Sequence, residues 1–194
     1  MKQEFDGNAA LKIWVEIYKK DSFTAEHCKR VADLVEKFAL RLGYTKEKAA
    51  EIKLAALIHD VGKLEIPDNL FEKMRQGIAL SEDELKIIKS HTERTKILTD
   101  FKNVPKTVIS ILKSHHERFN GSGYPDGLKG KEIPEEVRIL SIVDYYDSIV
   151  FQRPWKTPGL QKPLGKAEAI RMLIEEAYRR FDPELVKNFA EFLK

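Results

Sequence analysis

The sequence predicts an all-α fold, and three observations favour it. Apolar residues recur at helical spacing along most of the chain, no hairpin turn or β-branched alternation is present, and capping residues precede several apolar runs. Hydrophobic residues make up 42% of the 194 positions and charged residues 34%, a balance typical of soluble helical proteins. One sizeable core fits this length, whereas two domains would both be small.

The first half of the chain predicts a series of helices separated by short breaks. One helix covers 8–20, a second begins near Ser22 and ends at Gly43, and Thr45 caps a third. A short helical segment follows the break at Pro67. The apolar faces of these helices are expected to share one core.

The second half continues the helical pattern. Ser81 and Glu84 form a capping-box pattern that opens a helix through about Thr99. Pro105 and Pro134 open the next two helices, because proline is well tolerated at a helix start.

Two loops and two closing helices complete the predicted chain. Residues 120–133 hold four of the ten glycines and predict the clearest loop, and 153–165 predict a second. Two helices follow, with Asp182 as N-cap of the last and Pro183 at its first position.

Charge and cysteine content exclude several classes of protein. The excess of basic over acidic residues is only +3, which argues against binding to a DNA or RNA duplex. Cys28 is the only cysteine, so no disulfide can form within the chain, as is usual in a reducing compartment. The N-terminus lacks a signal-peptide pattern, and no run approaches the ~20 apolar residues of a membrane helix. We therefore expect a cytoplasmic protein without membrane insertion.

Histidines and aspartates in neighbouring positions are the candidate metal ligands. His59 precedes Asp60, and His115 precedes His116. Adjacent helical residues point about 100° apart, so such a pair reaches two neighbouring ions more easily than one. A carboxylate can bridge two ions, which makes Asp60 the candidate bridge. Asp144 lies in an apolar run, where an unpaired charge is costly and a bound metal would offset the cost.

Each of these residues also has an ordinary interpretation. A single histidine on a helix is usually a surface residue or a hydrogen-bonded core residue, and Asp144 alone could be a buried acceptor. Asp60 alone could be a solvated residue at a helix end, and Cys28 is expected to be a small buried hydrophobe. From spacing alone, a metal site and ordinary packing are about equally well supported.

A resemblance to a known family favours the metal site. The ordered candidate ligands resemble those of the HD superfamily of metal-dependent phosphohydrolases: His27, His59-Asp60, His91, His115-His116 and Asp144. Four longer strings resemble its HD-GYP branch, namely AALIHDVGKLEIPD at 55–68, HHERFNGSGYPDGLKGKEIP at 115–134, RILSIVDYYDSIVFQRPW at 138–155 and FDPELV at 181–186. The resemblance covers about 24–194. It implies a compact HD-domain bundle of about seven or more helices, with an N-terminal helical extension at 1–21 and a catalytic domain at 22–194.

The resemblance implies an enzyme that hydrolyses the bacterial second messenger cyclic di-GMP to pGpG, to GMP or to both. Two divalent ions would share Asp60, with His27, His59 and Asp144 on one side and His91, His115 and His116 on the other. Iron or manganese is expected, with zinc, cobalt or nickel as alternatives. The two ions would lower the pKa of a bridging water, giving a hydroxide that attacks phosphorus.

The resemblance also assigns residues to catalysis and substrate binding. Lys63, close after Asp60, would contact a substrate phosphate oxygen, and Asp147 would hydrogen-bond the bridging water or assist proton transfer. In the Gly-Tyr-Pro signature Tyr124 would contact the ligand. Phosphate or guanine recognition would fall to Arg153 and Lys156. Solvation of the three basic side chains, and a structural role for Tyr124 in its loop, remain alternatives.

The chain departs from the family pattern at several positions. Phe23 stands where some members have a glutamate that binds a third metal, so we expect two metals only. Asn120 replaces a usual aspartate and Thr95 a usual glycine. Residues 73–84 form a longer turn than usual and lack its proline. None of these changes removes a proposed ligand.

Two other functions remain as alternatives. The chain could be an HD-type phosphohydrolase for another cyclic dinucleotide or nucleotide, or an inert cyclic di-GMP sensor or protein-docking module. The Gly-Tyr-Pro string and the basic residues after 152 argue against the first, and the complete ligand set argues against the second. A homodimer or a separate regulatory protein stays open.

Overall fold

Helices form most of the structure, a computed structural model that describes residues 3–151 and 162–194. In chain order the α-helices are α1 (Gly7–Lys20), α2 (Ser22–Arg41), α3 (Lys46–Leu57), α4 (Asp68–Arg75), α5 (Glu82–Lys89), α6 (Lys106–Ser114), α7 (Glu135–Val150), α8 (Lys166–Glu175) and α9 (Pro183–Phe192). Short 3₁₀ helices connect them, namely η1 (Val61–Glu65), η2 (Ser90–Thr92), η3 (Lys96–Asp100) and η4 (Gly130–Glu132). The all-α prediction is confirmed.

One small element was not predicted. Strands β1 (Gln3–Glu4) and β2 (Phe101–Lys102) pair in parallel over two residues each. A strand of two residues is too short to show the alternation by which strands are recognised in a sequence.

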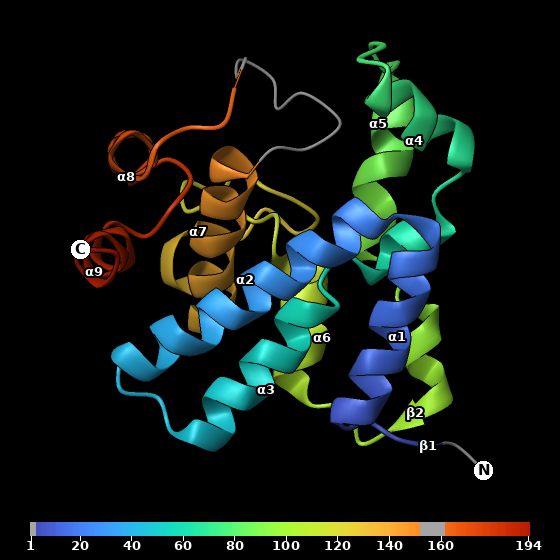
Figure 1. The fold of residues 1–194 in the computed structure, drawn as a ribbon, viewed down its shortest axis with the longest axis horizontal. Coiled ribbons are helices and arrows are strands. Elements are labelled where there is room, and N and C mark those ends of the chain that lie inside the picture. Colours follow the sequence, from blue (N-terminus) through green and yellow to red (C-terminus); the bar gives the residue numbers. More distant parts are fainter. Residues whose placement is uncertain (1–2, 152–161) are drawn as a thin grey trace.

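Helix α2 is the central element of the bundle (Figure 1). It crosses the molecule diagonally and packs against α1 and α3, and against α7 and α9. Asp21 caps its N-terminus by accepting a hydrogen bond from the backbone N–H of Thr24 at 2.9 Å. The buried stripe of α2 includes Val31, Val35 and Phe38, and the same face carries His27 inward. Helical periodicity therefore places the first candidate ligand inside the protein.

Helix α1 belongs to the same hydrophobic core as the rest of the bundle. Its buried residues Ala9, Ala10, Ile13 and Ile17 pack in the cluster that also contains the apolar face of α2. Helix α1 packs against α2, α3 and η1. The division of the chain into an N-terminal extension and a catalytic domain stays a prediction.

Helices α4 and α5 project from the body of the molecule (Figure 1). They enclose a separate small cluster of Ile66, Leu70 and Phe71. The predicted capping box at Ser81 is confirmed, but the helix that it opens ends at Lys89, whereas the sequence predicted an end near Thr99. The 3₁₀ turns η2 and η3 replace the rest of that helix, and η2 buries His91 against the body. The periodicity of apolar residues in a sequence does not show where tertiary packing makes the chain turn and end a helix.

The closing part of the chain follows the prediction closely. Asp182 caps α9, with Pro183 in the first position, and its carboxylate also binds the Arg138 side chain of α7. Within the described ranges, no helix is long and apolar enough to cross a membrane.

Candidate metal centre

Two groups of potential metal ligands lie next to each other at the centre of the bundle. In the first group, ligand atoms of His27, His59 and Asp144 all lie within 4.8 Å of one another. The His27 Nε2 atom is 2.8 Å from the Oδ1 atom of Asp144, and the His59 Nε2 atom is 3.9 Å from the same oxygen. The group joins α2, the turn after α3, and α7, three segments that are separated in the sequence.

The second group consists of histidines alone. Ligand atoms of His91, His115 and His116 also lie within 4.8 Å of one another. The Nε2 atoms of His91 and His115 are 3.2 Å apart, and the His115 and His116 ring centroids are 4.2 Å apart. The turn η2 supplies the first of these side chains and the C-terminal end of α6 the other two.

Asp60 lies between the two groups. Its Oδ2 atom is 3.6 Å from His59 Nε2 in the first group, and its Oδ1 atom is 3.5 Å from His91 Nε2 and 3.9 Å from His115 Nε2 in the second. One oxygen of the carboxylate therefore faces each group. This is the arrangement expected of a carboxylate that bridges two ions, and the seven ligand residues named from the sequence all meet here.

Burial favours the neutral form of four histidines of this centre, namely His59, His91, His115 and His116. Desolvation lowers the pKa of His91 to about 4 and that of His116 to about 3, and it also lowers the pKa values of His59 and His115. A neutral imidazole has the free lone pair that a metal requires. The centre is therefore prepared to bind metal near neutral pH without first losing protons from these rings.

Hydrogen bonds fix the orientation of several rings. Backbone carbonyl oxygens one turn earlier accept from Nδ1 of three histidines: Ala56 for His59 at 2.7 Å, Ile88 for His91 at 2.7 Å, and Leu112 for His115 at 3.0 Å. With Nδ1 engaged in this way, Nε2 is the atom left to bind a metal.

Lys63 forms an ion pair with the candidate bridge. Its Nζ atom lies 2.6 Å from Oδ2 of Asp60, both on or beside the 3₁₀ helix η1. Burial opposes ionisation of Asp60, but the Lys63 charge, with the surrounding imidazoles, holds the pKa of this carboxyl well below its usual value. Lys63 therefore lies beside the centre, on a 3₁₀ turn that follows directly after Asp60.

Asp147 contacts His27 and Arg30. The role that the resemblance gave it, a hydrogen bond to the bridging water or help with proton transfer, stays a prediction. The Oδ2 atom of Asp147 is 2.5 Å from His27 Nδ1, on the side of the ring away from Asp144. The guanidinium of Arg30 donates to both Asp147 oxygens at 2.9 Å. Because both oxygens are engaged and the side chain is buried, this position favours support of His27 over contact with a bridging water.

The Gly-Tyr-Pro loop covers the histidine-only side. The Tyr124 ring lies 5.0 Å from the ring of His116, and the Nζ atom of Lys89 lies 5.5 Å from the Tyr124 ring centroid. Gly123 is required by close packing, since a Cβ atom there would lie 2.5 Å from Cα of Glu117. Tyr124 thus lies beside the centre, while Arg153 and Lys156 lie outside the described residues.

Glu117 is a residue of this loop that the sequence did not single out. It is buried, and its carboxylate accepts three backbone hydrogen bonds, from Asp126 at 2.7 Å, Gly127 at 3.0 Å and Leu128 at 3.1 Å. Its place directly after His115-His116 was a signal that it belongs to the site. Arg30, one helical turn after His27, was likewise missed.

Cys28 is buried, as predicted, but it also lies at the edge of the centre. Its Sγ atom and ligand atoms of His59 and Asp60 lie within 4.8 Å of one another. Burial and then the negative charge of Asp60 raise the pKa of the thiol well above its usual value. The thiol is therefore protonated at neutral pH, which fits a packing role.

The donor set fits two first-row divalent ions. Imidazole nitrogens and carboxylate oxygens suit iron, manganese, cobalt, nickel and zinc, and no ion in this list needs a thiolate. Most of these mutually close ligand residues are buried, and bringing so many polar side chains together inside the protein is costly unless they bind a partner.

A helical bundle that holds one group of two histidines and an aspartate, one group of three histidines, and Asp60 between them defines the class of this protein. Residues 15–185 match the family model described as HD domain, and the chain belongs to this family.

Curated relatives of the chain carry specific names. The chain is 36% identical over 177 residues to a cyclic di-GMP phosphodiesterase of Thermotoga maritima, covering 90% of this chain and 46% of the relative. It is 34% identical over 170 residues to the 3'3'-cGAMP-specific phosphodiesterase 2 of Vibrio cholerae, covering 87% of this chain and 31% of that protein. The chain therefore spans less than half the length of these relatives.

Solved structures share the architecture. Bd1817, an HDG"Y"P protein of Bdellovibrio bacteriovorus, superposes with a TM-score of 0.66 at 26% identity, covering 87% of this chain and 52% of the other. The cyclic GMP-AMP phosphodiesterase V-cGAP3 of V. cholerae gives 0.68 at 16% identity, covering 93% and 48%. The second likeness supports the fold alone.

Proposed function

We propose that the chain is a metal-dependent phosphodiesterase that hydrolyses a cyclic dinucleotide, with cyclic di-GMP as the first candidate. The observation that carries the proposal is the position of Asp60, one oxygen facing each of two ligand groups. Relatives named as cyclic di-GMP phosphodiesterases support the substrate class. We further propose two ions, iron or manganese, as the native cofactor.

The residues of the centre divide the work of hydrolysis. Two divalent ions bound here would supply Lewis acidity and an activated water. Lys63, freed from Asp60 once that carboxylate is neutralised, would hold a non-bridging phosphate oxygen beside the centre. Tyr124 would offer its ring to a base of the substrate at the mouth of the site. Asp147 would keep His27 oriented.

A second candidate substrate has its own support. Relatives 34% and 33% identical to this chain are named 3'3'-cGAMP-specific phosphodiesterases. Both substrates offer the same cyclic phosphodiester backbone, so the metal centre does not distinguish them. The difference lies in one base, and contacts near Tyr124 are where discrimination is expected.

The deciding experiment measures turnover by protein purified without oxygen and loaded with Fe²⁺ or Mn²⁺. Cyclic di-GMP and 3'3'-cGAMP are supplied separately, and products are separated by chromatography, which also distinguishes pGpG from GMP. We expect hydrolysis that is lost in His59→Ala and Asp60→Ala but kept in Lys37→Met, an exposed position of α2. Full turnover in both centre variants would remove the metal centre from the mechanism. Tight ligand binding without turnover would support the inert sensor.

Location and assembly remain proposals. A cytoplasmic location agrees with the single buried thiol of Cys28 and with an intracellular second messenger as substrate. A homodimer is tested by light scattering of the purified chain.

A further inference from the structure

His27 is oriented differently from its neighbours in the centre. Three other histidines donate from Nδ1 to carbonyl oxygens of their own segment. His27 instead places Nδ1 2.5 Å from a carboxylate oxygen of Asp147, which comes from α7, 120 residues later in the chain. The orientation of this ligand therefore depends on a side chain that packing must hold in place.

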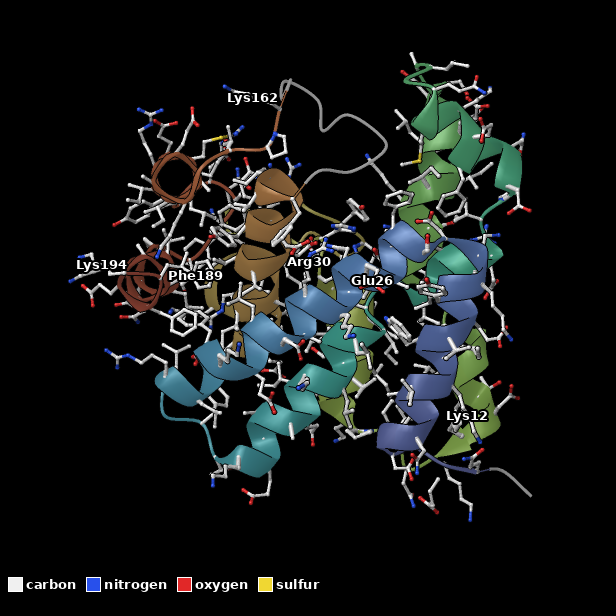
Figure 2. All side chains as sticks on the ribbon, in the orientation of Figure 1. Lys12, Glu26, Arg30, Lys162, Phe189 and Lys194 are labelled. Carbon is white, nitrogen blue, oxygen red and sulfur yellow. The ribbon has the colours of Figure 1, made fainter. Side chains whose placement is uncertain are left out.

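Arg30 holds that carboxylate. Its Nε atom donates to Oδ1 of Asp147 and its Nη2 atom to Oδ2, each at 2.9 Å, which is a bidentate geometry. Arg30 follows His27 by three residues, so both side chains project from one face of α2 toward α7. Figure 2 shows Arg30 in the space between these two helices. Its guanidinium also stacks on Phe151 at 4.3 Å, so its position is fixed from two directions.

The chain of contacts has a direct consequence for metal binding. A carboxylate that accepts a hydrogen bond from Nδ1 fixes the tautomer of an imidazole, so that Nε2 carries the lone pair and binds a metal more strongly. That Nε2 atom lies 2.8 Å from Asp144, the carboxylate in its ligand group. Arg30 restricts rotation of the Asp147 carboxylate and so keeps its oxygen on His27. In the histidine-only group, His91 and His115 bond instead to carbonyl oxygens of their own segments and to each other.

We propose that Arg30 is a positioning residue, acting through Asp147 and His27, that sets the affinity of one of the two metal sites. The affected site is the one formed by His27, His59 and Asp144. The proposal rests on the proposed function only in that the centre binds two metals, and it does not depend on which substrate is hydrolysed.

The test counts metal ions in the full chain without substrate. Metal-free protein is dialysed against a series of Mn²⁺ concentrations, and bound manganese per chain is measured. We expect two binding steps for the unaltered protein. In Arg30→Met one step should weaken about 10- to 100-fold while the other stays unchanged. At intermediate Mn²⁺, the magnetic-resonance signal of two coupled ions should give way to that of a single ion.

Matched variants separate positioning from general damage. Arg30→Lys keeps the charge but not the two-pronged geometry, so its affinity should fall between those of Arg30→Met and the unaltered protein. Lys37→Met removes an exposed cation from the same helix and should bind both ions normally. Urea unfolding of each metal-free variant confirms that the apoprotein folds.

A double-mutant cycle tests the path of the effect. Asp147→Asn should weaken the same single step, and adding Arg30→Met should then change the affinity less than twofold, because one acts through the other. Independent, additive losses would overturn the proposal, as would two unchanged steps in Arg30→Met. Failure of the proposed function is distinguishable, since it appears as absent turnover in unaltered protein that carries two ions.

Discussion

The Nζ atom of Lys63 lies 2.6 Å from Oδ2 of Asp60, so the ammonium group offsets the charge of the candidate bridge. Because the same ammonium can turn to a phosphate, its loss should affect turnover more than metal binding. We expect Lys63→Met to keep two Mn²⁺ ions and to lose about 100-fold or more in kcat. Steady-state hydrolysis and metal analysis on one preparation check this. An unchanged kcat would mean that Lys63 does not take part in hydrolysis and is a solvated side chain, the alternative stated above.

The buried histidines make the stability of the metal-free protein depend on pH. Burial holds the pKa of His91 near 4 in the folded state, against about 6.5 when unfolded. The unfolded chain therefore binds more protons below pH 6.5, and stability falls as the pH drops from about 6.5 toward 4. We expect His91 to lower the free energy of unfolding by roughly 1–2 kcal/mol when the pH falls from 7.5 to 5.

Urea unfolding of chelated protein at these two pH values measures the effect. His91→Gln should show a shallower dependence than the unaltered chain, because it removes one proton acceptor from the unfolded state. An equal dependence in the two proteins would contradict the assignment to His91.

At the scale of elements, one loop depends on one carboxylate. The Glu117 carboxylate accepts hydrogen bonds from the backbone N–H groups of Asp126, Gly127 and Leu128. The same loop places the Tyr124 ring beside the His116 ring. A buried charge with three donors holds its loop more firmly than the glycine-rich sequence alone could.

Replacement of this carboxylate should loosen the loop. Glu117→Gln presents an amide to donors that need an acceptor, so we expect a loss of about 1.5–3 kcal/mol in the free energy of unfolding. KM for the cyclic dinucleotide should rise more than kcat falls, because Tyr124 loses its support. Glu93→Gln, at an exposed position, is the control. A loss of bound metal without a change in KM would assign Glu117 to the centre and not to the loop.

At the scale of the whole molecule, the centre joins segments from α2 to α7. Metal binding to the folded state alone stabilises it by about 2.7 kcal/mol at a hundredfold excess over the dissociation constant. For a chain of this size, we expect chelation to lower Tm by about 5–10 °C. Thermal unfolding with chelator or with Mn²⁺ measures the shift, and Asp60→Ala should show little of it. An equal shift in Asp60→Ala would place the stabilising ion elsewhere.

The sequence alone predicted an all-α fold and several helix caps, and it named the seven residues that we propose as metal ligands. Periodicity and capping are local properties, which is why the N-caps Thr45, Ser81 and Asp182 were predicted correctly. The ligands were predicted because their order matches a family pattern. Spacing by itself did not decide whether these residues bind metal, since chelation depends on distances between helices.

Only the tertiary structure decided which atoms meet. The family resemblance gave Asp147 a hydrogen bond to the bridging water or a part in proton transfer, and the packing of α2 on α7 places its carboxylate against His27 and Arg30. The helix predicted to reach Thr99 ends at Lys89, because burying His91 beside His115 requires a turn at that point. Such contacts join residues far apart in the chain, and their geometry follows from side-chain packing that no local pattern encodes.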